Sequence, residues 1–122
     1  MRSAAAGTNT VTINATTGAR SITGADGGVL ATSTSGRATY TVSGEGGQTF
    51  SITPDATINM TRVGGAETIT VTPTVSAATG TLSGAIGSAG TLAIGVGGSF
   101  AVTNATATGN YTGTFNLVVA YN

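Results

Sequence analysis

Strict alternation of side-chain character near the end of the chain limits the fold more than any other feature. Between residues 111 and 121 one set of alternate positions is mostly apolar, and it consists of Tyr111, Gly113, Phe115, Leu117, Val119 and Tyr121. Successive side chains on a pleated backbone point to opposite faces, so a period of two residues predicts a β-strand. A terminal segment frays unless neighbours hold it. The sequence therefore predicts one long terminal strand, flanked by others.

Shorter runs with the same period recur along the chain, separated by glycine, proline and aspartate residues typical of turns. We expect these strands at residues 8–15, 21–23, 29–33, 37–43, 49–53, 56–62, 67–75, 91–94 and 97–102, with one short strand inside a long connection at 76–90. Pro73 within its run predicts an edge strand or a bulge, because proline cannot donate to a ladder. A period of 3.6 residues persists nowhere, so no substantial helix is expected.

This succession of short strands and turns predicts an all-β protein, either a sandwich or a barrel. A chain of 122 residues suits one domain. We expect that domain to cover residues 8–122, preceded at residues 1–7 by a disordered or donor-type segment. No apolar run is long enough to span a bilayer, so membrane insertion is not expected.

The charges and reactive groups exclude several classes of function. Only 7% of the residues are charged, the net charge is zero, and His and Cys are absent. Such a surface does not attract phosphate backbones or anionic lipid, which argues against nucleic-acid and membrane partners and favours self-association. Isolated acids without His or Cys provide neither acid–base pairs nor zinc ligands. We therefore predict no enzyme, no catalytic residue, no cofactor and no metal.

Several segments together resemble a family of bacterial secreted β-domains of unknown function. The matching pieces are residues 11–13, 17–20, 37–44, 50–52, 92–100 and 109–115, together with Tyr121. That family is similar to spore-coat-U-like and archaic chaperone-usher pilin subunits. Such pilins carry a glycine before the last strand and a penultimate tyrosine, and Gly109 and Tyr121 occupy those positions here.

The resemblance implies an immunoglobulin-like antiparallel β-sandwich that is incomplete, because one strand is supplied by another protein. The implied function is a structural subunit of an extracellular bacterial fibre or pilus, secreted through the periplasm and polymerising by β-strand complementation. Its implied partners are copies of itself, a periplasmic chaperone and an outer-membrane usher. An extended donor with alternate apolar residues satisfies both the backbone and the apolar pockets of such a groove.

Two sets of residues are candidates for this role. The donor candidates are Val11, Ile13 and Ala15, with the alternative that Val11 and Ile13 belong to the domain's own first strand and the donor lies elsewhere. The acceptor candidates are Gly109, Tyr111, Phe115, Leu117, Val119 and Tyr121.

A surface binding module is the alternative function. Thr-x-Thr pairs recur at positions such as Thr10/Thr12 and Thr112/Thr114. An array of this kind could bind ice, but threonine is also simply favoured on the solvent face of a strand. A carbohydrate-binding adhesin is the other form of this alternative, although sugar platforms favour exposed aromatic residues and Trp is absent.

Overall fold

The computed structural model describes residues 7–24 and 34–122, and this part of the chain is all-β without a helix. The strands are β1 (Thr8–Ile13), β2 (Arg20–Gly24), β3 (Ala38–Glu45), β4 (Thr49–Pro54), β5 (Ile58–Arg62), β6 (Thr68–Val75), β7 (Thr79–Thr81), β8 (Ala89–Thr103), β9 (Tyr111–Thr112) and β10 (Leu117–Tyr121). Every pairing is antiparallel, and the strands form two sheets. The predicted all-β antiparallel sandwich is confirmed. Residues 1–6 of the expected N-terminal segment and the expected strand at 29–33 lie outside the described residues.

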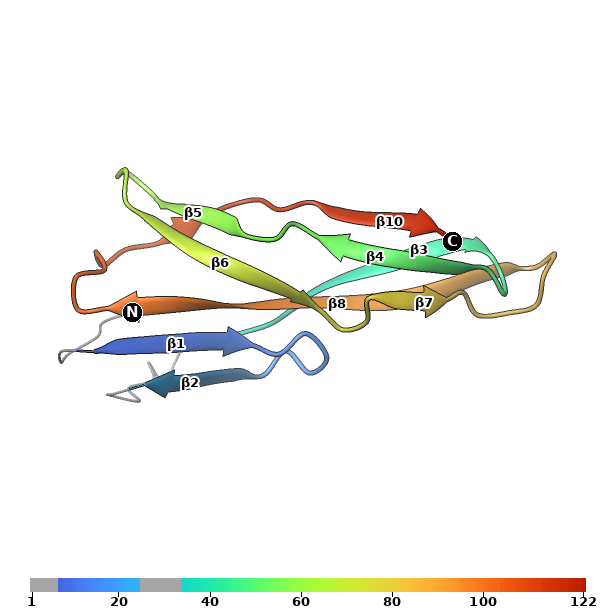
Figure 1. The fold of residues 1–122 in the computed structure, drawn as a ribbon, viewed down its shortest axis with the longest axis horizontal. Helices are drawn as coiled ribbons and strands as arrows, with labels where there is room; N and C mark the ends of the chain where they lie inside the picture. The colour runs from blue at the N-terminus through green and yellow to red at the C-terminus, as the bar shows by residue number, and fades with distance from the viewer. Residues whose placement is uncertain (1–6, 25–33) are drawn as a thin grey trace.

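The first sheet is built around β8, which runs nearly the full length of the molecule (Figure 1). The order is β2-β1-β8-β6-β5-β9, and β3 also pairs with β8. The expected break between residues 94 and 97 is wrong, because β8 continues through its glycines. A Cβ at Gly95 or Gly97 would collide with the carbonyl oxygen of Ala15 or Ile13. These glycines therefore allow close backbone approach and do not interrupt the strand.

Strand β6 lies inside the first sheet and changes its pairing partner along its length. Residues 68–71 pair with β5, whereas residues 71–75 pair with β8. Pro73 lies opposite Gly98 in the part of β6 that β5 no longer accompanies. Residues 72–75 of β6 thus pair with β8 alone, which agrees with the edge position predicted from Pro73. Strand β6 as a whole is nevertheless an interior strand of the sheet.

The single long terminal strand predicted at residues 111–121 is wrong. Strand β9 pairs with β5 in the first sheet, and β10 pairs with β4 in the second sheet, whose order is β10-β4-β7. The break between β9 and β10 lies beside the break between their partner strands, β5 and β4. There the Asp55 amide donates to the Asn116 carbonyl oxygen at 3.1 Å, and Asp55 Oδ2 accepts from the Asn116 amide at 2.7 Å. The chain therefore passes from the first sheet at β9 to the second sheet at β10.

The main core lies where the second sheet covers β8. Its buried members are Phe50, Ile52, Leu82 and Ile94. Partly buried side chains pack around them, namely Val42, Val75, Leu92 and Leu117. The core is small, and it occupies the half of the molecule that contains β3, β4, β7 and β10.

Candidate functional site

Two strands at the same side of the sandwich each have one free edge among the described residues. Strand β10 ends the order of the second sheet, and β3 pairs with β8 alone. Two contacts across the gap show that these edges face each other. The Tyr40 and Phe115 rings meet edge to face, with centroids 6.2 Å apart. A Cβ at Gly44 would collide with the hydroxyl of Tyr121. We call this region the open side, defined by Tyr40, Phe115, Leu117, Val119 and Tyr121.

The inward-facing side chains of β10 are unusually exposed. Val119 lies directly opposite Ile52, and Tyr121 lies opposite Phe50, so each pair shares the inner face of its sheet. Phe50 and Ile52 are 0% and 3% exposed, whereas Val119 and Tyr121 are 39% and 64% exposed. The inner face of the second sheet is therefore covered at β4 and uncovered at β10.

Strand β3, on the other side of the gap, also carries an inward-facing side chain that is exposed. Tyr40 on β3 lies opposite Ile94 on β8, and the two side chains therefore face the same way. Ile94 is 1% exposed, but Tyr40 is 42% exposed. Both sheets thus leave part of their apolar inner face open along their free edges.

The backbone of β10 also offers unused hydrogen-bonding groups. The Asn116 carbonyl accepts from Asp55, and the Asn122 amide donates to the Thr49 carbonyl at 3.1 Å, so even-numbered residues direct their backbone groups toward β4. Backbone groups alternate in direction along an antiparallel strand. Leu117, Val119 and Tyr121 therefore direct their N–H and C=O groups to the free edge. This edge combines backbone groups ready to pair with exposed apolar side chains.

Apolar cavities continue the open side toward β9. A cavity of about 270 Å³ lies where Phe115 and Gly113 face Ile13 and Gly36. Two more, of about 260 Å³ and 670 Å³, lie nearer Tyr111. All three have Phe100 and Met60 in their walls.

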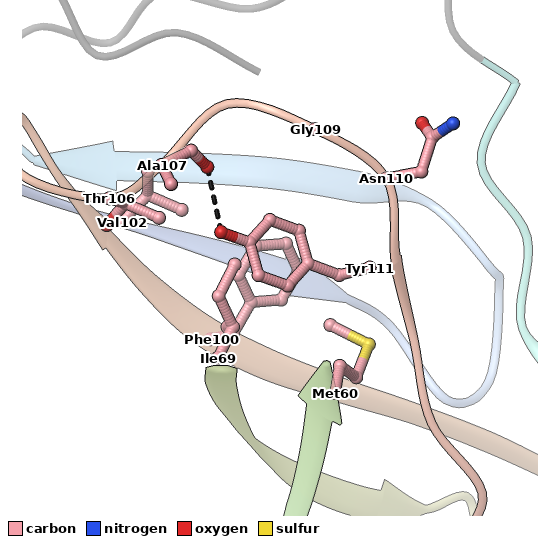
Figure 2. Close-up of a pocket in the computed structure, with 9 residues that line it drawn as sticks. All are labelled: Met60, Ile69, Phe100, Val102, Thr106, Ala107, Gly109, Asn110 and Tyr111. Atoms are coloured by element: carbon pink, nitrogen blue, oxygen red, sulfur yellow. Dashed lines mark hydrogen bonds between the residues drawn. The ribbon is translucent and has the colours of Figure 1, made fainter. Parts of the chain in front are cut away.

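The cavity of about 260 Å³, which we call the end cavity, is drawn in Figure 2. Its lining residues are Met60, Ile69, Phe100, Val102, Thr106, Ala107, Gly109, Asn110 and Tyr111. The Tyr111 hydroxyl donates to the Ala107 carbonyl oxygen at 2.8 Å, so the phenol is held inside the cavity. Figure 2 shows the Asn110 side chain directed away from the apolar walls. The interior is therefore mainly hydrocarbon and aromatic surface.

The structure brings the acceptor candidates together along one side. Gly109 and Tyr111 line the end cavity, and Phe115 lines the cavity of about 270 Å³. The remaining candidates, Leu117, Val119 and Tyr121, form β10. Sequence reasoning missed Tyr40 and Gly44 as parts of this site. The alternation along residues 37–43 predicts that Tyr40 faces inward, but the strand that lies across from it depends on tertiary structure.

The donor candidates occupy places in the chain's own domain. Val11 and Ile13 belong to β1, which pairs with β2 on one edge and β8 on the other. They also line the cavity of about 670 Å³. Ala15 follows in a turn, where its carbonyl oxygen accepts from Arg37 Nη1 at 2.9 Å. A donor role for these residues would require β1 to leave its sheet.

One ion pair lies beside the end cavity. Arg62 donates from Nε to Glu67 Oε2 at 2.7 Å and from Nη2 to Oε1 at 2.8 Å. The pKa of Glu67 is lowered to about 2, mainly by the hydrogen bonds that its carboxylate accepts from Arg62. A Cβ at Gly109 would lie 2.9 Å from the Arg62 Cδ, so this glycine makes room for the arginine stem. The pair therefore orders the β5–β6 turn against the segment that leads into β9.

Metal and membrane features are absent from the part of the chain that is described. Within residues 7–24 and 34–122, no group of three His, Cys, Asp or Glu side chains could hold a metal ion. The same residues contain no helix long and apolar enough to cross a membrane.

Comparison with known proteins identifies a family. The protein-family model described as "Domain of unknown function (DUF4402)" matches residues 1–121. No curated protein and no solved structure matches the chain. The match spans nearly the whole sequence, and the chain therefore belongs to the DUF4402 domain family.

Proposed function

We propose that this chain is a structural subunit of an extracellular bacterial fibre or pilus, and that copies join by β-strand complementation at the open side. The observation that carries the proposal is the contrast within two cross-strand pairs. Val119 and Tyr121 face the same way as the buried Ile52 and Phe50, yet they are themselves exposed. An added strand beside β10 would cover this face.

The added strand has two requirements, and the open side meets both. Its backbone needs partners, and Leu117, Val119 and Tyr121 direct N–H and C=O groups to the free edge. Its inward side chains need apolar surroundings, which the core beside β10 and the wall of β3 provide. Main-chain bonds contribute affinity and alternate side chains contribute specificity in this mode of recognition.

We place the donor in an extended segment of a neighbouring copy. Strand β1 is paired on both edges within its own sheet, so Val11 and Ile13 are already in use. The proposal therefore does not assign the donor role to β1 as it lies in the described structure. A partner protein of the chaperone type would cover the same edge before assembly, since an uncovered apolar edge promotes aggregation. In this proposal the subunit is secreted through the periplasm before assembly and lies at the cell surface afterwards.

Adjacent valines of β10 allow a matched test. Val119 faces the open side, whereas Val118 is 59% exposed on the outer face of the same strand. We expect Val119→Asp to abolish filaments, because a carboxylate would be buried beneath the added strand without a partner. Val118→Asp should leave filaments intact, because its side chain stays in water.

The assay is electron microscopy of purified protein over a range of concentrations, with sedimentation velocity on the same samples. Circular dichroism shows whether both variants remain folded. Wild-type protein that stays a folded monomer at every concentration would exclude this function. So would filaments of the Val119→Asp variant that match those of wild type. Ice-growth and glycan-array measurements on the monomer test the alternative of a surface binding module.

A further inference from the structure

The β1–β2 hairpin, residues 8–24, is attached to the other described strands along one edge. Strand β2 pairs with β1 alone among these strands, and the other edge of β1 pairs with residues 98–103 of β8. Strand β3 pairs with residues 89–96 along the same side of β8. The two ladders are separated at Gly97, so loss of the β1 ladder would leave the β3 ladder intact. Figure 1 shows the hairpin at the margin of the first sheet.

The inner face of the hairpin lies over a cavity and away from the core. Val11, Ile13 and Ile22 line the cavity of about 670 Å³. Val11 is buried, whereas Ile13 and Ile22 are only half-buried. The core cluster lies in the other half of the molecule and includes no residue of the hairpin. Side chains that face a void lack packing partners on that side, and regions with few buried apolar contacts open more readily than the core.

Arg37 connects the turn of the hairpin to the start of β3. Its Nη1 donates to the Ala15 carbonyl oxygen at 2.9 Å and also to the Thr16 carbonyl oxygen. Ala15 and Thr16 lie in the β1–β2 turn, and Arg37 lies one residue before β3. Arg37 is exposed, so water competes for both carbonyl groups. The two hydrogen bonds therefore hold the hairpin against the rest of the domain with a modest free energy.

We propose that the β1–β2 hairpin opens as a unit while the core half stays folded, and that Arg37 holds it closed. Opening breaks the β1–β8 ladder and the Arg37 hydrogen bonds, but it leaves the β3 ladder and the core cluster in place. An isolated two-stranded hairpin is marginally stable at best in water, so β1 and β2 lose their own pairing once they leave β8. The open state presents β1 and residues 98–103 of β8 as unpaired edges. This opening does not depend on strand addition at β10.

Native-state hydrogen exchange measures this opening amide by amide. The reference amides are Ile52 and Leu82 in the core, whose N–H groups donate to the carbonyl oxygens of Ala78 and Gln48 at 2.7 Å and 3.0 Å. We expect the amides of residues 8–13 to have protection factors at least about ten-fold lower than these two. Their exchange should also depend less on urea, because opening exposes less surface than global unfolding. A parallel measurement in the Val119→Asp background keeps the result independent of strand addition at β10.

Two variants change the hairpin in opposite directions. Arg37→Gln removes the charged donor and should lower the protection of the hairpin amides about five-fold, with core protection unchanged. Arg62→Gln is the matched control, and it should leave hairpin protection unchanged. Thr10→Cys combined with Ala101→Cys places two thiols at opposite positions on β1 and β8, within the range of a disulfide. Oxidation of this variant should raise hairpin protection to the core level, and reduction should reverse the change.

Three results would overturn the proposal. Equal protection factors and equal urea dependence for hairpin and core amides would mean that the hairpin unfolds only with the whole domain. A loss of core protection in Arg37→Gln as large as the loss in the hairpin would mean that Arg37 stabilises the domain in general. Unchanged hairpin protection after oxidation of the cysteine pair would mean that exchange does not require β1 to leave β8.

Discussion

The cross-strand pair of Phe50 and Tyr121 provides a sharp test of the open side. The two residues lie opposite each other on β4 and β10 and share the inner face of the second sheet. Phe50 is fully buried in the core cluster, whereas Tyr121 is mostly exposed. Replacing each by alanine removes an aromatic ring from the same face of the same sheet. The two substitutions should nevertheless have very different effects.

Phe50→Ala should reduce the free energy of unfolding by about 3–5 kcal/mol, because it removes buried surface and leaves a cavity. A domain of this size is stable by only about 5–15 kcal/mol, so much of the variant should be unfolded under mild stress. Tyr121→Ala should cost less than about 1 kcal/mol, because most of the ring is already in water. It should still impair assembly, since the added strand would lose an apolar contact.

Urea unfolding followed by circular dichroism measures both free energies, and sedimentation velocity measures assembly on the same preparations. A destabilisation by Tyr121→Ala that approaches that of Phe50→Ala would refute the reasoning. It would mean that the inner face at β10 is covered within the isolated subunit. Full assembly of the Tyr121→Ala variant would show that the open side does not accept a strand there.

Two further predictions concern other parts of the fold. The pKa of Glu67 is lowered to about 2 by Arg62, below the usual value of about 4.3, so the ion pair contributes stability above that usual value and loses it as the pH falls toward 2. Thermal unfolding of Glu67→Gln should therefore differ from wild type at pH 7 and converge with it at acid pH. Gly95→Ala should destabilise the domain by about 1–3 kcal/mol, because a Cβ there meets the carbonyl oxygen of Ala15. Gly36→Ala is the matched control, since nothing lies within 4 Å of a Cβ at that position, and equal unfolding free energies for the two variants would contradict this account.

The free edge of β10 lacks the usual protection against pairing. Natural edge strands carry charges, prolines or bulges that discourage the addition of another strand. Strand β10 contains none of the charged residues and no proline, and valines lie exposed on both of its faces. Strand β3 differs, because its outward positions carry Thr39, Thr41 and Ser43 and it ends at Glu45. The contrast supports β10 as the edge at which a strand is added.

The sequence alone determined most of the strands, the faces of their side chains and the scarcity of catalytic chemistry, but not every strand boundary. The alternation along residues 111–121 correctly predicts that Val119 and Tyr121 face inward, because that direction is a local property of a pleated backbone. Tertiary structure decided that these inward side chains are exposed. Exposure depends on whether another strand lies alongside, and that neighbour comes from a distant part of the chain or from another molecule. The change of sheet between β9 and β10 has the same origin, because it follows the break between their partner strands β5 and β4. Local periodicity contains no information about which strands end together, so the open side became visible only in the folded arrangement.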